Sequence, residues 1–158
     1  MADEKELKAA RAAFRTMCEM LDDRGWHYDR NDDEFTVRFG VRGEDIPMNI
    51  TMNVSADTHM AYLTSHLPFD VPEISRDAIV MAVCRANNGI VDGCFDFNYD
   101  DGHILFRLSS CFLDSLMSKA MFEYMLLVSC NTVDAYNDKF MHVIKSGMSC
   151  DKVAEYIS

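Results

Sequence analysis

The sequence predicts an α+β fold in which helices pack on the apolar face of a mostly antiparallel sheet. Apolar residues recur every three or four positions in three segments, as in helices that bury one face, and they alternate with polar residues in the segments between. Glycine-containing turn sequences separate the alternating segments. The expected order is helix, four strands, helix, two strands and a long helix, all within one domain covering residues 1–158.

The composition limits the classes of partner. Among 158 residues, 15 are Lys or Arg and 26 are Asp or Glu, which gives a net charge of −11. Nucleic acids and anionic membranes are bound mainly through clustered Lys and Arg, so we expect neither as a partner.

The sequence also indicates a cellular location. The first residues lack the pattern of a signal peptide, and no apolar run approaches the roughly 20 residues of a membrane span. We therefore expect a cytoplasmic protein. Its six cysteines include no CxxC pair, and we expect them to be reduced and mostly buried.

The first helix is expected from Asp3 to about Asp23, and Gly25 ends it. Asp3 is a suitable N-cap because Glu6, at the third helical position, can complete a capping box. The apolar stripe of this helix consists of Leu7, Ala10, Phe14, Met17, Cys18 and Leu21.

Two hairpins can be placed by requiring the turn chemistry and the alternation of polar and apolar residues to agree. In the first, Gly43-Glu44 is expected to form a two-residue loop. This register pairs Phe39 with Met48 and Val37 with Ile50, so that one face of the hairpin is apolar.

The second hairpin is expected to turn at Asp101-Gly102, a strong signal for a two-residue loop. This register pairs Phe97 with Phe106 on the apolar face and sets Asp96 opposite Arg107 on the other face. We expect the two charged side chains to form an exposed ion pair worth about 0.2–1 kcal/mol.

Further strands and helices are expected at residues 26–30, 59–67, about 73–89, about 115–147 and 149–157. The helix near residue 73 should end through Asn87-Asn88-Gly89, because these residue types tolerate left-handed backbone. The long helix contains a polar stretch at residues 129–132, where a kink or a break would be tolerated.

Known catalytic and metal-binding motifs are missing from the sequence. It contains no GxSxG, HExxH or Walker loop, and no GxGxxG after a strand. Stretches beginning at Asp29 and Asp96 imitate the start of an EF-hand loop, but neither has glycine at its sixth position or glutamate at its twelfth. We therefore expect no enzymatic activity, no cofactor and no metal. A metal or ligand pocket assembled in space from Cys and His side chains is the alternative.

Twelve methionines either fill the core at helical and strand spacing or leave adaptable apolar surface on the helices. A helix with apolar residues on two faces has two partners, so the surplus methionines are candidates for contacts between copies or with other proteins. Those on expected helices are Met17, Met20, Met81, Met117, Met121, Met125, Met141 and Met148.

The central part of the sequence, residues 79–107, resembles the YbjN family of bacterial sensory transduction regulators. The shared pattern is a helix ending in an Asn-containing segment at Asn87-Asn88, a strand, the acidic turn at Asp101-Gly102, and a strand with Arg107 near its end. The order of elements over residues 3–146 is similar too. That family in turn resembles the type III secretion chaperones.

The resemblance implies a function without catalysis. Type III secretion chaperones are small, acidic, usually dimeric cytosolic proteins that hold segments of partner proteins. We therefore expect a homodimeric protein-binding module, chaperone-like or regulatory, with a dedicated type III secretion chaperone as the narrower alternative. Binding would use strand addition at a sheet edge or a segment laid in an apolar groove.

The sequence offers few candidates for the contact residues. Leu105 is expected to face away from the apolar side of the sheet, and Leu63 is expected to do the same. We predict that both contact a partner protein, the alternative being that a helix covers them.

Overall fold

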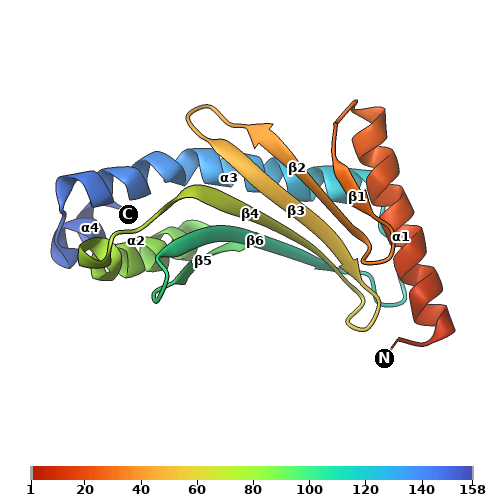
Figure 1. The fold of residues 1–158 in the computed structure, drawn as a ribbon. Coiled ribbons are helices and arrows are strands. Elements are labelled where there is room, and N and C mark those ends of the chain that lie inside the picture. Colours follow the sequence, from red (N-terminus) through yellow and green to blue (C-terminus); the bar gives the residue numbers. More distant parts are fainter. Residues whose placement is uncertain (1, 158) are drawn as a thin grey trace.

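The computed structural model describes residues 2–157 and has the expected order of elements, with a six-stranded antiparallel sheet ordered β1-β2-β3-β4-β6-β5 (Figure 1). The elements are α1 (Glu4–Asp23), β1 (Asp29–Asn31), β2 (Thr36–Arg42), β3 (Pro47–Ser55), β4 (Met60–Asp70), the 3-10 turn η1 (Glu73–Ser75), α2 (Arg76–Gly89), β5 (Cys94–Asn98), β6 (His103–Cys111), α3 (Lys119–Ser146) and α4 (Cys150–Tyr156). The predicted α+β class is therefore confirmed.

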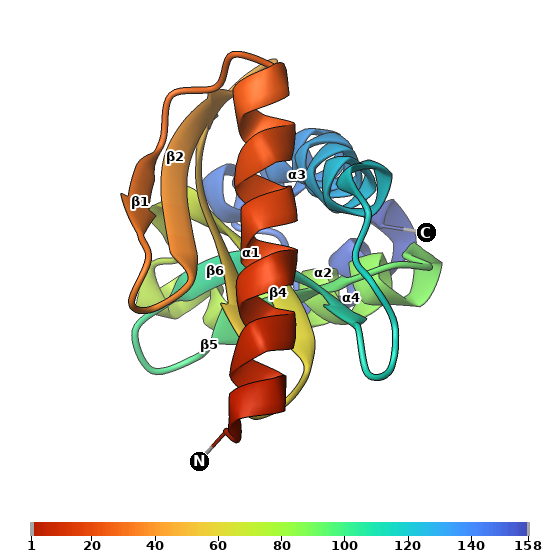
Figure 2. The ribbon, with the colours of Figure 1, turned by 90° about the vertical axis from the view of Figure 1, so that its right-hand side faces the viewer.

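The helices lie on one face of the sheet. α1 packs on β3, α3 packs on β4 and β6, and α2 packs on β5 (Figure 2). The strands bury alternate residues against these helices, as the alternation in the sequence predicts. The buried strand residues are Thr36, Val37, Phe39, Met48, Ile50, Met52, Val54, Ala61, Leu63, Ser65, Leu67, Phe95, Ile104, Phe106 and Leu108.

α1 begins as predicted. The Asp3 side chain accepts a hydrogen bond from the Glu6 amide at 2.8 Å, and the Glu6 carboxylate accepts one from the Asp3 amide at 2.6 Å, which completes the capping box. The predicted stripe is buried except for Leu7, which is exposed.

The register predicted for the first hairpin is wrong by two residues. Phe39 pairs with Ile50, and the loop has four residues, 43–46, instead of two. The Glu44 amide donates to the Asp134 carboxylate of α3 at 3.1 Å, so a contact with a distant helix stabilises the longer loop. Because a shift of two residues preserves the side to which each side chain points, the predicted faces are still correct.

The second hairpin shows the same kind of error. Phe97 pairs with Ile104 instead of Phe106, and the loop covers residues 99–102. The predicted ion pair is confirmed, with 2.7 Å between Arg107 Nε and Asp96 Oδ2, although the two residues lie diagonally across the strands.

Gly102 in this loop has a φ of 79°, and a Cβ atom there would lie 2.4 Å from the backbone oxygen of Val71. We predict that Gly102→Ala lowers the free energy of unfolding by more than the roughly 1–2 kcal/mol expected from left-handed backbone alone. Gly25→Ala is the control, because Gly25 has a φ of 69° but nothing within 4 Å of the added atom. Urea denaturation measures both, and equal losses would contradict the predicted clash.

The predicted end of α2 is partly wrong. The helix does end at Gly89, but the next residue, Ile90, is extended, and none of residues 87–89 is left-handed. α3 is one continuous helix through residues 129–132, so the polar stretch produces no break. It starts at Lys119 with Ser118 as N-cap, later than predicted, and ends as predicted at Gly147, which is left-handed.

The prediction that the cysteines are mostly buried is wrong. Cys18 is buried, whereas Cys84 and Cys111 are exposed and the other three are half-buried. Apolar neighbours in the sequence therefore do not show the side to which a cysteine points.

Candidate protein-binding surface

The two leucines predicted to contact a partner lie on opposite faces of the sheet. Leu63 is fully buried against the helices, so the prediction that it faces outward is wrong. It pairs with Leu108, and both belong to the core. Leu105 does lie on the outer face and is half-buried there, so its contact with a partner stays a prediction.

The outer face of the sheet is mixed in character. Among residues 2–157, no helix lies over it, and Figure 1 looks onto this open side. Leu105 lies between His66 of β4 and Asp96 of β5, which are its cross-strand neighbours. A single half-buried leucine surrounded by polar side chains offers little apolar area to a partner.

Both edges of the sheet are poor templates for an added strand. β1 has three residues, all polar. At the other edge, the Asn87 side chain of α2 donates to the Phe95 carbonyl at 2.9 Å and accepts from the Phe95 amide at 2.8 Å. These are the backbone groups that a new strand would need beside Phe95 on β5. The structure therefore favours binding in a groove over strand addition.

Two histidines meet on the outer face, which the sequence did not predict. His66 Nδ1 lies 2.8 Å from His103 Nε2, and His103 Nδ1 lies 3.3 Å from Asp70 Oδ1. The residues are far apart in the sequence and are brought together by the pairing of β4 with β6. Burial, and then the neighbouring His103, lower the pKa of His66 from its ordinary value.

This lowered pKa gives a pH dependence of stability. Because folded His66 takes up a proton at lower pH than the unfolded chain does, stability falls as the pH drops through about 6.5, and the loss is complete below the folded pKa. We predict that His66→Gln reduces the drop in Tm between about pH 7.5 and 5.5, measured by differential scanning calorimetry. The exposed His27 provides the control His27→Gln, and an unchanged drop in His66→Gln would refute the prediction.

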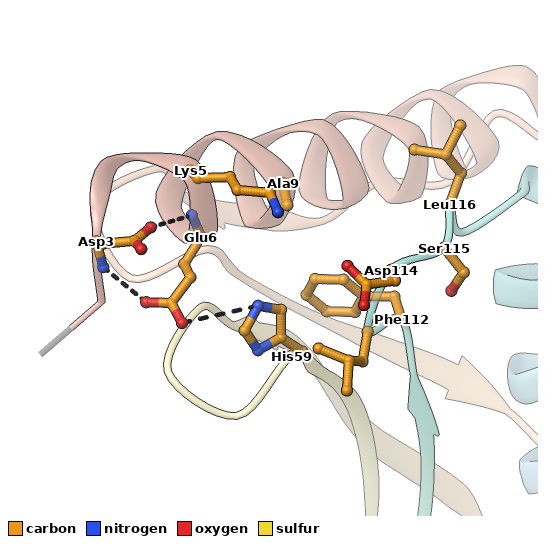
Figure 3. Close-up of a pocket in the computed structure, with 10 residues that line it drawn as sticks. Asp3, Lys5, Glu6, Ala9, His59, Phe112, Asp114, Ser115 and Leu116 are labelled. Atoms are coloured by element: carbon orange, nitrogen blue, oxygen red, sulfur yellow. Dashed lines mark hydrogen bonds and ion pairs between the residues drawn. The ribbon is translucent and has the colours of Figure 1, made fainter.

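A more pronounced surface feature lies where the start of α1 meets two turns of the sheet (Figure 3). It is a hollow of about 450 Å³. α1 supplies Asp3, Lys5, Glu6 and Ala9, the turn before β4 supplies His59, and the loop after β6 supplies Phe112, Leu113, Asp114, Ser115 and Leu116. We call it the α1 hollow.

Local backbone geometry builds the α1 hollow. His59 and Asp114 both have positive φ values, 53° and 51°, which turn the two loops sharply. The Phe112 amide donates to the His59 carbonyl at 2.8 Å and the Phe112 ring lies 5.9 Å from the His59 ring, so the two loops are held together. The buried Phe112 forms the floor.

The α1 hollow combines apolar walls with an acidic rim. Two large apolar side chains beside the cavity are left in contact with solvent: Leu116 is 90% exposed and Leu113 is 60% exposed. The rim carries the carboxylates of Asp3, Glu6 and Asp114, against Lys5. Glu6 Oε1 also lies 3.9 Å from His59 Nε2. A dashed line joins these two side chains in Figure 3.

The α1 hollow continues along α1. A second hollow of about 300 Å³ shares Ala9, Phe112, Ser115 and Leu116 with it and extends past Ala12 and Thr16. Leu116 therefore stands between two hollows that follow the same helix. The two hollows together follow α1 as one groove, which is the arrangement in which an extended segment of polypeptide is held.

Within the part of the chain that the structure describes, no three His, Cys, Asp or Glu side chains are grouped so that they could hold a metal ion. Between residues 2 and 157, no helix is both long enough and apolar enough to cross a bilayer.

The fold is that of two proteins of known structure. A chain in the crystal structure of the ExsC–ExsE complex matches with a TM-score of 0.59 and 15% identity, over 82% of this chain and 93% of that chain. YbjN from E. coli, a proposed transcription regulator, matches with a TM-score of 0.58 and 10% identity, over 82% and 94%. The resemblance seen in the sequence is thus confirmed for the fold, which is of the type III secretion chaperone kind. No protein-family model and no curated protein matches the chain.

The sequence did not reveal the α1 hollow. Leu113 and Leu116 stand in a short segment between a strand and a helix, where isolated apolar residues are common. The one feature of the sequence that pointed to this region was Asp114-Ser115 between two leucines. These two polar residues interrupt the apolar run and favour a turn there.

Proposed function

We propose that this protein is a non-enzymatic, chaperone-like or regulatory module that holds a segment of another polypeptide in the α1 hollow. The observation that carries the proposal is the exposure of two leucines, Leu113 and Leu116, at the edge of the α1 hollow, whose charged lining residues are mostly acidic. When a partner covers large apolar side chains next to a hollow, their surface is removed from water, and this makes the free energy of binding more favourable.

The charges define the chemistry of the partner segment. Three carboxylates and one ammonium line the α1 hollow, Arg15 lines its continuation along α1, and the whole chain carries a net charge of −11. The electrostatic field of such a protein attracts basic segments and repels acidic ones. The proposed occupant is therefore an extended segment in which large apolar residues alternate with Lys or Arg.

The fold supports a role in protein binding. A chain with this fold occurs in the ExsC–ExsE complex, which is an assembly of two different proteins. The blocked β5 edge directs the partner away from strand addition and toward a groove. The narrower form of the proposal is a dedicated type III secretion chaperone, whose partner would be an exported protein.

Two further statements belong to the proposal. We place the protein in a bacterial cytoplasm, where its cysteines remain thiols. We also propose that two copies associate, as the surplus of apolar residues on the helices indicates.

A peptide titration tests the α1 hollow. The probe is a fluorescein-labelled twelve-residue peptide of alternating Leu and Lys, and the control has Glu in place of every Lys. Fluorescence anisotropy should show micromolar binding of the basic peptide, no binding of the acidic one, and weaker binding in high salt because the charges are then screened. Equal binding of the two peptides, or no binding of the basic one, contradicts the proposal.

A further inference from the structure

The two hollows along α1, which together we call the α1 groove, carry opposite charges. The α1 hollow is lined by the carboxylates of Asp3, Glu6 and Asp114 and by the ammonium of Lys5. Among residues 2–157, Arg15 is the one charged residue that lines the continuation. The α1 groove is therefore mostly acidic at the start of the helix and basic further along it.

Each end of the α1 groove has a charge that the chain does not neutralise. Within residues 2–157, the Asp114 carboxylate and the Arg15 guanidinium take part in no hydrogen bond or ion pair, and both residues are exposed. By contrast, Lys119 beside the far end of α1 pairs with Asp23 at 2.8 Å. A bound segment can therefore pair with Asp114 and with Arg15 without breaking an existing contact.

Arg15 also borders a third hollow, of about 340 Å³, that lies on another side of α1. Two more arginines, Arg11 and Arg30, line that hollow together with Asp32 and Asp33. Arg30 is paired with Asp32 at 2.6 Å, and the two aspartates balance the charges of these two arginines. Arg15 is thus a surplus charge there and is available to the α1 groove.

The middle of the α1 groove suits a large apolar side chain. Ala9, Phe112 and Leu116 line both hollows, and Ala12 lines the continuation. The two alanines leave room because their side chains are short, and the exposed Leu116 offers apolar surface to whatever lies against it. The apolar contact is therefore expected between the two charged ends.

We propose that the segment held in the α1 groove has a Lys or Arg at the end that lies in the α1 hollow and an Asp or Glu at the end that reaches Arg15. This inference rests on the proposed function and adds which residue of the segment meets which end of the groove. The Asp or Glu takes one of the positions that Lys or Arg would otherwise occupy.

The length of the α1 groove sets the spacing of the two charged residues. Glu6 and Arg15 are about 14 Å apart along the helix axis, and an extended chain covers about 3.3 Å per residue, so the two charges are about four positions apart. Residues two and four positions apart point to the same side of an extended chain. The pattern is thus basic, any residue, apolar, any residue, acidic, with the apolar side chain against Leu116.

The two ends contribute specificity more than affinity. Exposed charge pairs are individually weak, but a wrong pairing sets like charges against each other. A segment that is basic throughout sets a cation against Arg15, and a segment bound in the reverse direction meets repulsion at both ends. Arg15 therefore selects among basic segments and fixes the direction in which one is held.

Peptide titrations with charge variants of the full-length protein test this arrangement. The probes are the labelled Leu-Lys peptide and two mixed-charge peptides, in which Glu replaces every Lys of either the first or the second half. Arg15→Glu should tighten binding of the Leu-Lys peptide and weaken binding of the mixed-charge peptide that the wild type prefers. The ratio of these two Kd values, measured by fluorescence anisotropy, should change at least about fivefold.

Lys152→Glu is the matched control. Lys152 is exposed on α4, which lies at the opposite end of the molecule from α1 (Figure 1), and the change alters the net charge by the same amount. It should change the ratio by less than about twofold because the site is distant and screened by salt. An unchanged ratio in Arg15→Glu, or an equal change in both variants, would overturn the inference and leave binding in the α1 hollow in place. If no peptide binds to the wild type, the proposed function fails with it.

Paramagnetic labelling of the peptide gives an answer on the wild-type protein, whether or not the variants fold. A nitroxide at the acidic end of the preferred mixed-charge peptide should broaden the amide signals of residues 12–16. A nitroxide at the basic end should instead broaden those of residues 3–6. Equal broadening of both regions by either label would overturn the inference.

Discussion

Replacing Leu116 by serine is expected to weaken binding of the basic peptide at least about tenfold. Leu116 is 90% exposed between the two hollows along α1, so a bound segment would bury nearly all of it. Burying a leucine side chain contributes about 1.5–3 kcal/mol, and about 1.4 kcal/mol corresponds to a factor of ten in Kd. Anisotropy titration of the labelled peptide gives the Kd of each protein.

The control for this prediction is Ile74→Ser. Ile74 is 94% exposed in η1, so the change removes a similar side chain at a similar exposure but away from the α1 hollow. Neither substitution changes the net charge, so the general attraction of the basic peptide stays the same. Equal Kd values for the two variants would show that the peptide does not use Leu116.

Replacing Asn87 by leucine should lower the free energy of unfolding by about 2–4 kcal/mol. Its side chain makes two hydrogen bonds to the backbone of Phe95, at 2.9 and 2.8 Å, and Phe95 itself is buried. Leucine would leave the amide and the carbonyl of Phe95 without these partners, and each unsatisfied buried group costs about 1–3 kcal/mol. Urea denaturation measures the change.

Asn88→Leu is the control for this change. Asn88 is the next residue of α2 and is exposed, so the same substitution should alter stability by less than about 0.5 kcal/mol. A loss in Asn87→Leu no larger than in Asn88→Leu would mean that the contact with β5 contributes nothing. Because Asn87 also blocks the edge of β5, Asn87→Leu should in addition aggregate more readily when partly unfolded.

Local patterns were sufficient to predict the layers of the fold. The spacing of Phe14, Met17 and Leu21 predicted the buried face of α1, and alternation predicted which side of the strands in the two hairpins is buried. Both patterns depend on a period that each element repeats several times, so one irregular residue does not change the result.

Registers could not be predicted in the same way. Both hairpins have four-residue loops where two-residue loops were expected, and each loop is stabilised by contacts that are not local in sequence. Glu44 is held by Asp134, ninety residues away, and the Gly102 carbonyl accepts a hydrogen bond from the Val71 amide at 2.8 Å. Turn chemistry alone does not contain these contacts.

The candidate site was the least predictable part. Leu63 was placed on the wrong face because the length of the turn before β4 was unknown, and a change of one residue there reverses the face of the strand. The α1 hollow joins three segments that are distant in the sequence, near residues 6, 59 and 114. Its components look ordinary until the fold brings them together, as is also true of His66 and His103.

The position of a bound segment tests the central claim most directly. Backbone amide chemical shifts of the isotopically labelled protein should be recorded while the unlabelled basic peptide is added. The account predicts that the largest changes fall at residues 3–9, 59 and 112–116, and that they saturate with the Kd found by anisotropy. Changes centred instead on Leu105 and the outer face of the sheet would contradict it.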